Sequence, residues 1–199
     1  SGKLGSMVSV WARAPSEALA EETPTPKGLE GLGTGQIDVA GLLSIADEND
    51  NSRPNGSSMS FLVEAFGKVL LLAGDAHPND LAKAIAARSD TDGSPLEVDV
   101  FKLSHHGARK NTTLELLGHV AADVYAISTN GRHGHPDSST LAKVVRSNER
   151  SKILAFNYRT SATVSWKAEG LQSSENFLAL FPDNGTDGHL LVELPLVGS

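Results

Sequence analysis

The chain has 199 residues, of which 39% are hydrophobic and 5% aromatic, and this length suits one domain with a proper buried core. A net charge of −7 argues against a broad electrostatic grip on nucleic acid, which requires clustered Lys and Arg. The absence of cysteine excludes disulfides and thiolate metal sites. No apolar run approaches the ~18 residues of a membrane span, and no signal-peptide pattern opens the chain, so we expect a cytoplasmic protein without a membrane partner.

The N-terminal quarter predicts little fixed structure. Residues 1–57 are expected to hold a cloning remnant, one short strand and a mobile linker, because the stretch is rich in Pro, Gly and Glu. Within it, residues 37–45 suit either a brief helix or a brief strand, and residues 47–58 read as a polar loop. We expect the ordered domain over residues 58–199.

The domain is organised around two strands joined by a helix. Residues 61–66 alternate weakly, Gly67 and Lys68 suit a tight turn, and residues 69–73 form a continuous apolar run, as in a buried strand. A short helix capped at residue 79 or 80 is expected over 80–88, and a second strand over 98–103.

Residues that bind metals follow both strands. Asp75 comes directly after the first strand, and His105 and His106 follow the second. Parallel neighbours joined by a helical crossover end at the same edge of a sheet, so we expect Asp75 to meet one of the histidines there. Adjacent residues on an extended chain point in opposite directions, so one histidine is expected to ligate. We favour His106, and the reverse assignment stays open.

The rest of the chain continues the alternation of strands and helices that is typical of an α/β fold. The first strand of this part delivers a polar loop with Arg132, His133 and His135 to the same edge. Helices are expected over 112–120 and 138–147, and strands over 124–128, 153–157, 162–166, 176–181 and 190–194.

Three motifs together resemble a known family. They are Leu-Leu-Ala-Gly-Asp at 71–75, Leu-Ser-His-His-Gly at 103–107 and Ile-Ser-Thr-Asn-Gly-Arg-His-Gly-His-Pro at 127–136, preceded by Asn-Gly-Ser-Ser at 55–58. Their order and spacing resemble the C-terminal half of a metallo-β-lactamase-fold hydrolase, in the branch related to the metallohydrolase domain of the competence protein ComEC. The resemblance implies the C-terminal portion of an αββα sandwich, with a mixed sheet and flanking helices. The His-x-His-x-Asp-His cluster of the family's N-terminal half does not occur in this chain.

The resemblance also implies roles for individual residues. Asp75 and His106 would be metal ligands, with Asp75 bridging two cations, and both would be catalytic. His135 would lie beside the metal centre and contact a substrate oxyanion or assist proton transfer. The residues expected to hold substrate are His105, His133, Arg132 and Lys102, with Arg109 as a further phosphate-binding candidate and His77 as a weaker one. The alternatives are a turn-forming Asp, a structural histidine pair and ordinary surface cations.

Imidazole and carboxylate ligands suit Zn²⁺ or Mn²⁺, and a catalytic metal lowers the pKa of its bound water towards ~7. We therefore expect a metal-dependent hydrolase with two zinc ions in the complete site, or manganese, acting on phosphodiesters or nucleic acid. Asp75 and one histidine give two protein ligands, whereas zinc enzymes usually supply three. The others would come from an N-terminal half of the same fold, as a missing segment or a separate chain, or from a homodimer.

One alternative is a non-catalytic binding or assembly module derived from the same fold. The absent His-rich cluster favours it. The sequence offers no Gly-x-Ser-x-Gly elbow, phosphate-binding loop or dinucleotide fingerprint, so other catalytic classes find less support.

Overall fold

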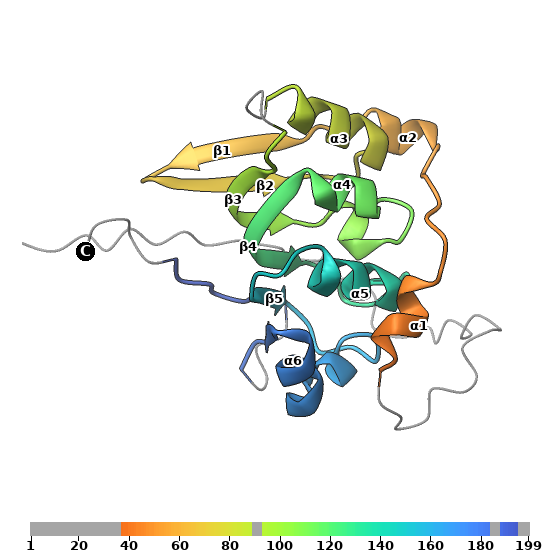
Figure 1. Ribbon diagram of the computed structural model, residues 1–199, viewed down its shortest axis with the longest axis vertical. Helices are drawn as coiled ribbons and strands as arrows, with labels where there is room; N and C mark the ends of the chain where they lie inside the picture. The colour runs from red at the N-terminus through yellow and green to blue at the C-terminus, as the bar shows by residue number, and fades with distance from the viewer. Residues whose placement is uncertain (1–36, 89–92, 184–187, 195–199) are drawn as a thin grey trace, which may run out of the picture.

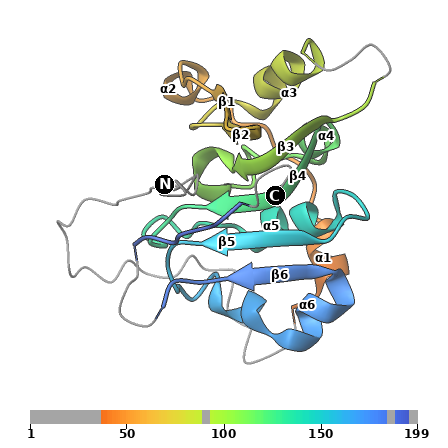
Figure 2. The ribbon, with the colours of Figure 1, turned by 90° about the vertical axis from the view of Figure 1, so that its left-hand side faces the viewer.

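A six-stranded mixed sheet forms the centre of the protein, as Figures 1 and 2 show for the computed structural model, which describes residues 37–88, 93–183 and 188–194. The strands follow one another in sequence order across the sheet. They are β1 (Phe61–Ala65), β2 (Lys68–Leu72), β3 (Leu96–Lys102), β4 (Val120–Ile127), β5 (Lys152–Phe156) and β6 (Phe177–Leu180). β1 and β2 form an antiparallel hairpin, and each later strand is parallel to its neighbour.

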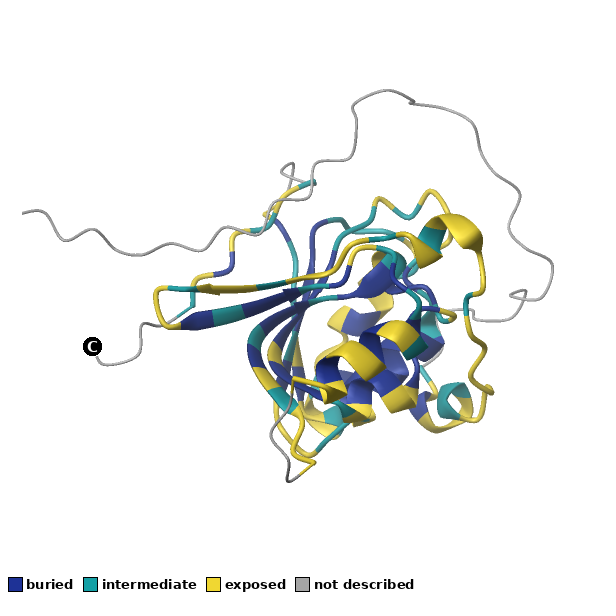
Figure 3. Ribbon diagram, turned by 90° about the horizontal axis from the view of Figure 1, so that it is seen from above, coloured by how far each residue is buried: buried dark blue, intermediate teal, exposed yellow. Residues whose placement is uncertain are grey.

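The helices that connect the parallel strands lie against one face of this sheet, whereas α2 lies at its carboxyl edge. The described part contains α1 (Val39–Leu43), α2 (Arg53–Gly56), α3 (Pro78–Ala86), α4 (Leu114–Gly118), α5 (Ser138–Arg146) and α6 (Glu169–Glu175), with 3₁₀ turns at Ser104–Gly107 and Val164–Lys167. Each parallel strand is added beside the previous one in the same direction across the sheet. Because such crossovers are right-handed, every connecting helix lies on the same face of the sheet. The main core therefore lies between helices and sheet, where Figure 3 shows the buried residues. The expected α/β class with a mixed sheet and flanking helices is confirmed.

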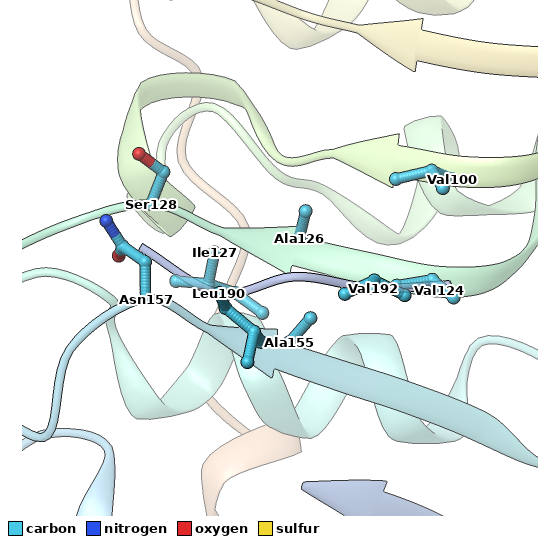
Figure 4. Close-up of a pocket in the computed structure, with 9 residues that line it drawn as sticks. All are labelled: Val100, Val124, Ala126, Ile127, Ser128, Ala155, Asn157, Leu190 and Val192. Carbon is cyan, nitrogen blue, oxygen red and sulfur yellow. The ribbon is translucent and has the colours of Figure 1, made fainter. Parts of the chain in front are cut away.

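The opposite face of the sheet carries a smaller apolar cluster. Its strand residues are Leu70, Val100, Val124, Ala126 and Ala155. The C-terminal segment 188–194 crosses this face and covers part of it with Leu190 and Val192, as Figure 4 shows. Hydrogen bonds between Gly188 and Asn157 fasten the start of the segment. The strand expected over 190–194 is therefore wrong: the alternating apolar side chains pack onto the face of the sheet and do not extend its edge.

The strands β1, β2 and β3 lie within two residues of their predicted bounds, but the turn between β1 and β2 lies one residue earlier than the expected Gly67 and Lys68. Phe66 and Gly67 form the two-residue turn with positive φ values of 53° and 71°, as primed hairpin turns require. The helix expected over 80–88 begins earlier, at Pro78, because proline suits the first helical position and His77 serves as the cap. Thr113 caps α4 by accepting a hydrogen bond of 3.2 Å from the backbone N–H of Leu116.

The strand expected over 162–166 is wrong. The Thr163 hydroxyl accepts the Thr160 backbone N–H at 2.9 Å, and the Thr163 N–H donates to the Thr160 carbonyl at 3.0 Å. These local bonds turn the chain despite the β-branched alternation. Trp166 is consequently buried against Phe177, with ring centroids 5.9 Å apart, and α6 follows.

Part of the expected linker belongs to the packed domain. Residues 37–45, for which helix and strand were both open, contain α1, and Asp38 caps it with a 2.9 Å hydrogen bond from the Gly41 N–H. Val39 is buried in the main core. The Asp47 carboxylate forms an ion pair with Lys143 of α5. The expected cloning remnant and short strand lie outside the described residues.

In the described residues, no helix has the length and apolar character needed to cross a bilayer.

We predict that Asp47→Ala lowers the free energy of unfolding by about 3 kcal/mol, because it leaves the buried Lys143 ammonium without its partner carboxylate. Glu97→Ala is the matched control, since it removes an exposed pair with Arg150 and should cost about 0–1 kcal/mol. Urea denaturation of both variants checks the difference. Equal losses of unfolding free energy in the two variants would show that the ion pair of Asp47 with Lys143 stabilises the fold no more than an exposed ion pair does.

Candidate functional site

The loops that follow β2, β3 and β4 meet at the carboxyl edge of the sheet. The His105 backbone N–H donates to the Gly74 carbonyl at 2.9 Å, and the Asp137 N–H donates to the Gly107 carbonyl at 3.1 Å. Parallel pairing of β2 with β3 and of β3 with β4 brings these loops together. Asp75, the histidine pair and the His135 loop therefore share one edge, as the strand order predicts.

The histidine pair does not lie on extended chain. His105 and His106 occupy a 3₁₀ turn with left-handed φ values of 45° and 59°. Their ring centroids are 6.2 Å apart, and the His105 ring lies 5.4 Å from that of His135. Side chains alternate only on extended backbone, so alternation does not limit the site to one of these two histidines.

His106 is held with one ring nitrogen free to ligate. Its Nδ1 contacts the backbone carbonyl of Ser128, which only accepts hydrogen bonds, so Nδ1 carries the proton and Nε2 carries a lone pair in the neutral ring. Burial lowers the pKa of His106, and the charge of Lys102 adds to this effect, while the Ser128 bond and Asp75 oppose it. A carbonyl-held neutral imidazole is the usual arrangement of a metal-ligating histidine.

His105 lies in a polar network with two asparagines. Its Nδ1 is 3.2 Å from Asn111 Oδ1 and 3.2 Å from Asn55 Nδ2. Both amides also contact the Asp50 carboxylate. Asn55 belongs to the Asn-Gly-Ser-Ser motif noted in the sequence, whereas Asp50 and Asn111 were missed as site residues because they follow no periodic or family pattern.

Asp75 is positioned by Ser58. The Asp75 backbone N–H donates to the Ser58 hydroxyl at 2.8 Å. Gly74 precedes it with φ of 59°, and a Cβ there would lie 2.6 Å from Ser58 Oγ and 2.7 Å from the Met59 carbonyl. Only glycine allows this close approach, which orients the backbone at Asp75.

The charge of the Asp75 carboxylate acts on the Lys102 ammonium. Burial lowers the pKa of Lys102 to about 8, and the negative charge of Asp75 opposes that shift. Its ammonium donates to the Leu103 carbonyl at 2.8 Å. An ammonium with such a pKa is a strong hydrogen-bond donor near neutral pH, suited to an anionic oxygen.

His135 faces the carboxylate of Asp137, the residue that precedes α5. His135 Nδ1 lies 3.3 Å from Asp137 Oδ2. The two atoms are close enough for an ion pair, but they are not aligned for a hydrogen bond. The same oxygen accepts the Arg109 N–H at 2.8 Å. Burial works to raise the pKa of Asp137, but His135 and the Arg109 N–H outweigh it and lower the pKa overall.

The other candidates have different surroundings. The Arg109 side chain pairs with Glu48 at 2.7 Å, and His77 Nε2 donates to the Ser52 carbonyl at 2.8 Å. Both therefore link the N-terminal segment to the rest of the domain. Arg132 and His133 are exposed on the loop between β4 and α5.

Among the described residues, no three His, Asp or Glu side chains form a group that could hold a metal ion. The donors that fit one are the Nε2 lone pair of His106 and the carboxylate of Asp75, whose charge acts on the pKa of His106. Their chemistry suits Zn²⁺ or Mn²⁺, but two donors are fewer than a zinc site normally takes from protein.

Comparison of the chain with protein-family models, with curated proteins and with solved structures returned no match. The resemblance of the three motifs to metallo-β-lactamase-fold hydrolases thus stays a prediction.

A small cavity lies beside the site on the open face of the sheet, as Figure 4 shows. Its volume is about 20 Å³, enough for one water molecule. Apolar side chains line most of it, with Ser128 and Asn157 at the end nearest the candidate site. It is too small to accept a substrate.

We predict that Gly74→Ala destabilises the fold more than Gly67→Ala. Both positions have positive φ, which costs an L-residue about 1–2 kcal/mol, but only the Cβ at Gly74 meets other atoms. The clash should add about 1–3 kcal/mol. Denaturant unfolding measures both, and equal losses would contradict the tight packing of Gly74 against Ser58.

We also predict that Asp75→Asn lowers the pKa of Lys102 below its value of about 8, because the carboxylate favours the charged ammonium. The ¹³C shift of the Lys102 side chain, followed against pH by NMR without metal, measures it. Asp80→Asn, on the exposed side of α3, is the control and should leave the pKa unchanged. A Lys102 pKa that does not change in Asp75→Asn would show that the Asp75 carboxylate does not act on the Lys102 ammonium.

Proposed function

We propose that this chain is the C-terminal portion of a metal-dependent hydrolase of the metallo-β-lactamase superfamily that acts on phosphodiesters, nucleic acid among them. The observation that carries the proposal is the hydrogen bond from His106 Nδ1 to the Ser128 carbonyl, which leaves Nε2 free beside Asp75. The three motifs lie on loops at one edge of a parallel sheet, the usual position of an α/β site. The sheet has helices on one face and an apolar cluster on the other, which also suits half of an αββα sandwich.

The residues divide into ligands and substrate-contacting groups. His106 and Asp75 would hold zinc, or manganese, with Asp75 able to bridge two ions. A metal held there would supply a hydroxide nucleophile near neutral pH for the attack on phosphorus. His135, oriented by Asp137, donates a proton to the leaving oxygen, and Lys102 binds a non-bridging phosphoryl oxygen and offsets its charge.

The proposal includes a partner, because catalytic zinc sites usually take three protein ligands. An N-terminal half of the same fold, or a second copy of this chain, would supply the remaining donors. Such a half would pack on the open sheet face, where the 188–194 segment covers only part of the apolar cluster. Arg132 and His133 are exposed and available to substrate in that complex.

A non-catalytic binding or assembly module is the second candidate. The absence of a three-residue metal group from the described residues favours it. The Lys102 ammonium then supplies the positive charge beside Asp75 that a cation supplies in the hydrolase.

Zinc titration calorimetry distinguishes the two candidates. We predict that Asp75→Asn and His106→Gln each weaken Zn²⁺ binding by about 100-fold or more, since loss of a direct ligand should exceed the 10–100-fold effect of losing an outer partner. His119→Gln, at the opposite edge of the sheet beside β4, should bind like the unmodified chain. Hydrolysis of bis(p-nitrophenyl) phosphate should fall in parallel. Zinc binding that neither variant weakens would contradict the proposed metal site.

A further inference from the structure

The loop that follows β5 also reaches the candidate site. Asn157 is the first residue after this strand, is buried, and lies beside Ser128 at one end of the small cavity, as Figure 4 shows. Its backbone N–H donates to the Ile127 carbonyl at 3.3 Å, so the pairing of β5 with β4 continues to this position. Sequence reasoning did not select Asn157, because none of the three motifs contains it.

The peptide group between Ser128 and Thr129 is held from both sides. Its carbonyl, on Ser128, accepts the proton of His106 Nδ1. Its N–H, on Thr129, donates to Asn157 Oδ1 at 2.8 Å. The peptide bond is trans, so its carbonyl and its N–H point in opposite directions. The bond to Asn157 therefore sets the direction of the Ser128 carbonyl, which is toward the His106 ring.

The surroundings of Asn157 determine which atom of its amide faces Thr129. A backbone N–H only donates, so the atom that it meets must be the oxygen, Oδ1. On the other side, Asn157 Nδ2 donates to the Gly188 carbonyl at 3.4 Å, and the Gly188 N–H donates to the Asn157 carbonyl at 2.7 Å. The donor at Thr129 and the acceptor at Gly188 require the same amide orientation.

These hydrogen bonds all run in one direction. His106 Nδ1 donates to the carbonyl of the Ser128–Thr129 peptide. The N–H of that peptide donates to the Asn157 amide, which in turn donates to Gly188. Hydrogen bonds that follow one another through amide groups polarise each other, so the bond to Asn157 makes the Ser128 carbonyl a stronger acceptor. A stronger acceptor holds the proton on His106 Nδ1 and leaves the lone pair on Nε2.

We propose that Asn157 is a positioning residue that holds His106, through the Ser128–Thr129 peptide, in the ring orientation and tautomer that leave Nε2 free. The use of this nitrogen by a metal ion rests on the proposed function, whereas the positioning of the ring does not. Without the bond to Asn157, the peptide could rotate and its carbonyl would no longer hold the Nδ1 proton. The His106 ring could then carry its proton on Nε2, which would block the proposed ligand.

Two variants of similar side-chain size separate this role from packing. Asn157→Leu accepts no hydrogen bond, whereas Asn157→Asp keeps an oxygen for the Thr129 N–H. Two-bond ¹H–¹⁵N correlation NMR of ¹⁵N-histidine-labelled, metal-free protein distinguishes Nδ1–H from Nε2–H, at a pH about two units above the ordinary histidine pKa of ~6.5. We expect Nδ1–H at His106 in the unmodified chain and in Asn157→Asp, and a rise of the Nε2–H form in Asn157→Leu. A role in packing alone would not make the tautomer follow the acceptor.

Asn148→Leu is the matched control. Asn148 Oδ1 accepts the Arg150 N–H at 3.0 Å before the start of β5, at the amino end of this strand. The control thus removes the same kind of hydrogen bond away from the site and should leave the His106 tautomer unchanged. Nε2–H at His106 in the unmodified chain, or Nδ1–H retained in Asn157→Leu, overturns the proposal.

Two further measurements complete the test. If Asn157→Leu does not fold, hydrogen exchange of the unmodified chain decides: the Thr129 amide must be protected, and rapid exchange there overturns the proposal. If it folds, its zinc affinity should fall about 10–100-fold, as for loss of an outer partner of a ligand. The expected tautomers, with zinc binding absent from both chains or equal in both, would support the positioning role and contradict the proposed function instead.

Discussion

The candidate site depends on one constraint, the parallel order of β2, β3 and β4 with every helical crossover on the same face. This order makes three strands end at the same edge, so residues about 30 positions apart in sequence become neighbours. The backbone bonds from His105 to Gly74 and from Asp137 to Gly107 then join the three loops. Without this order, the three sequence motifs would be unrelated turns.

Within that edge, hydrogen-bond partners determine what each ring nitrogen can do. The Ser128 carbonyl fixes the proton of His106, and Asn111, itself held by Asp50, faces Nδ1 of His105. Burial meanwhile lowers the pKa of Lys102 and of His106, which favours a neutral imidazole near neutral pH. Backbone carbonyls and amides therefore do as much as the titratable groups to define the chemistry available here.

Strong local signals let the sequence predict much of this architecture. The Gly67 turn between two apolar runs identified the hairpin, and the crossover helix between β2 and β3 predicted that the loops with Asp75 and the histidines lie at one edge of the sheet. Weaker patterns misled where tertiary packing decided the outcome. The alternation of 162–166 and 190–194 suits a strand, but one segment turns on Thr163 and the other packs on the sheet face.

The sequence predicted only those residues of the candidate site that belong to the three motifs. Asp50 and Asn111 are 61 residues apart and belong to no periodic pattern, so their contact with each other depends on the fold alone. The left-handed backbone of His105 and His106 likewise could not be predicted from two adjacent histidines, because non-glycine residues rarely adopt it. Asp137 follows His135 by two residues, and that short spacing was the available signal that its carboxylate lies beside the His135 ring.

The most direct test of the account is a crystal soaked with ZnCl₂, with diffraction data collected at the zinc absorption edge. The account predicts an anomalous peak within about 2.0–2.2 Å of His106 Nε2 and of an Asp75 carboxylate oxygen. A peak at neither residue, with zinc bound only elsewhere on the chain, would contradict the assignment of this sheet edge as a metal site.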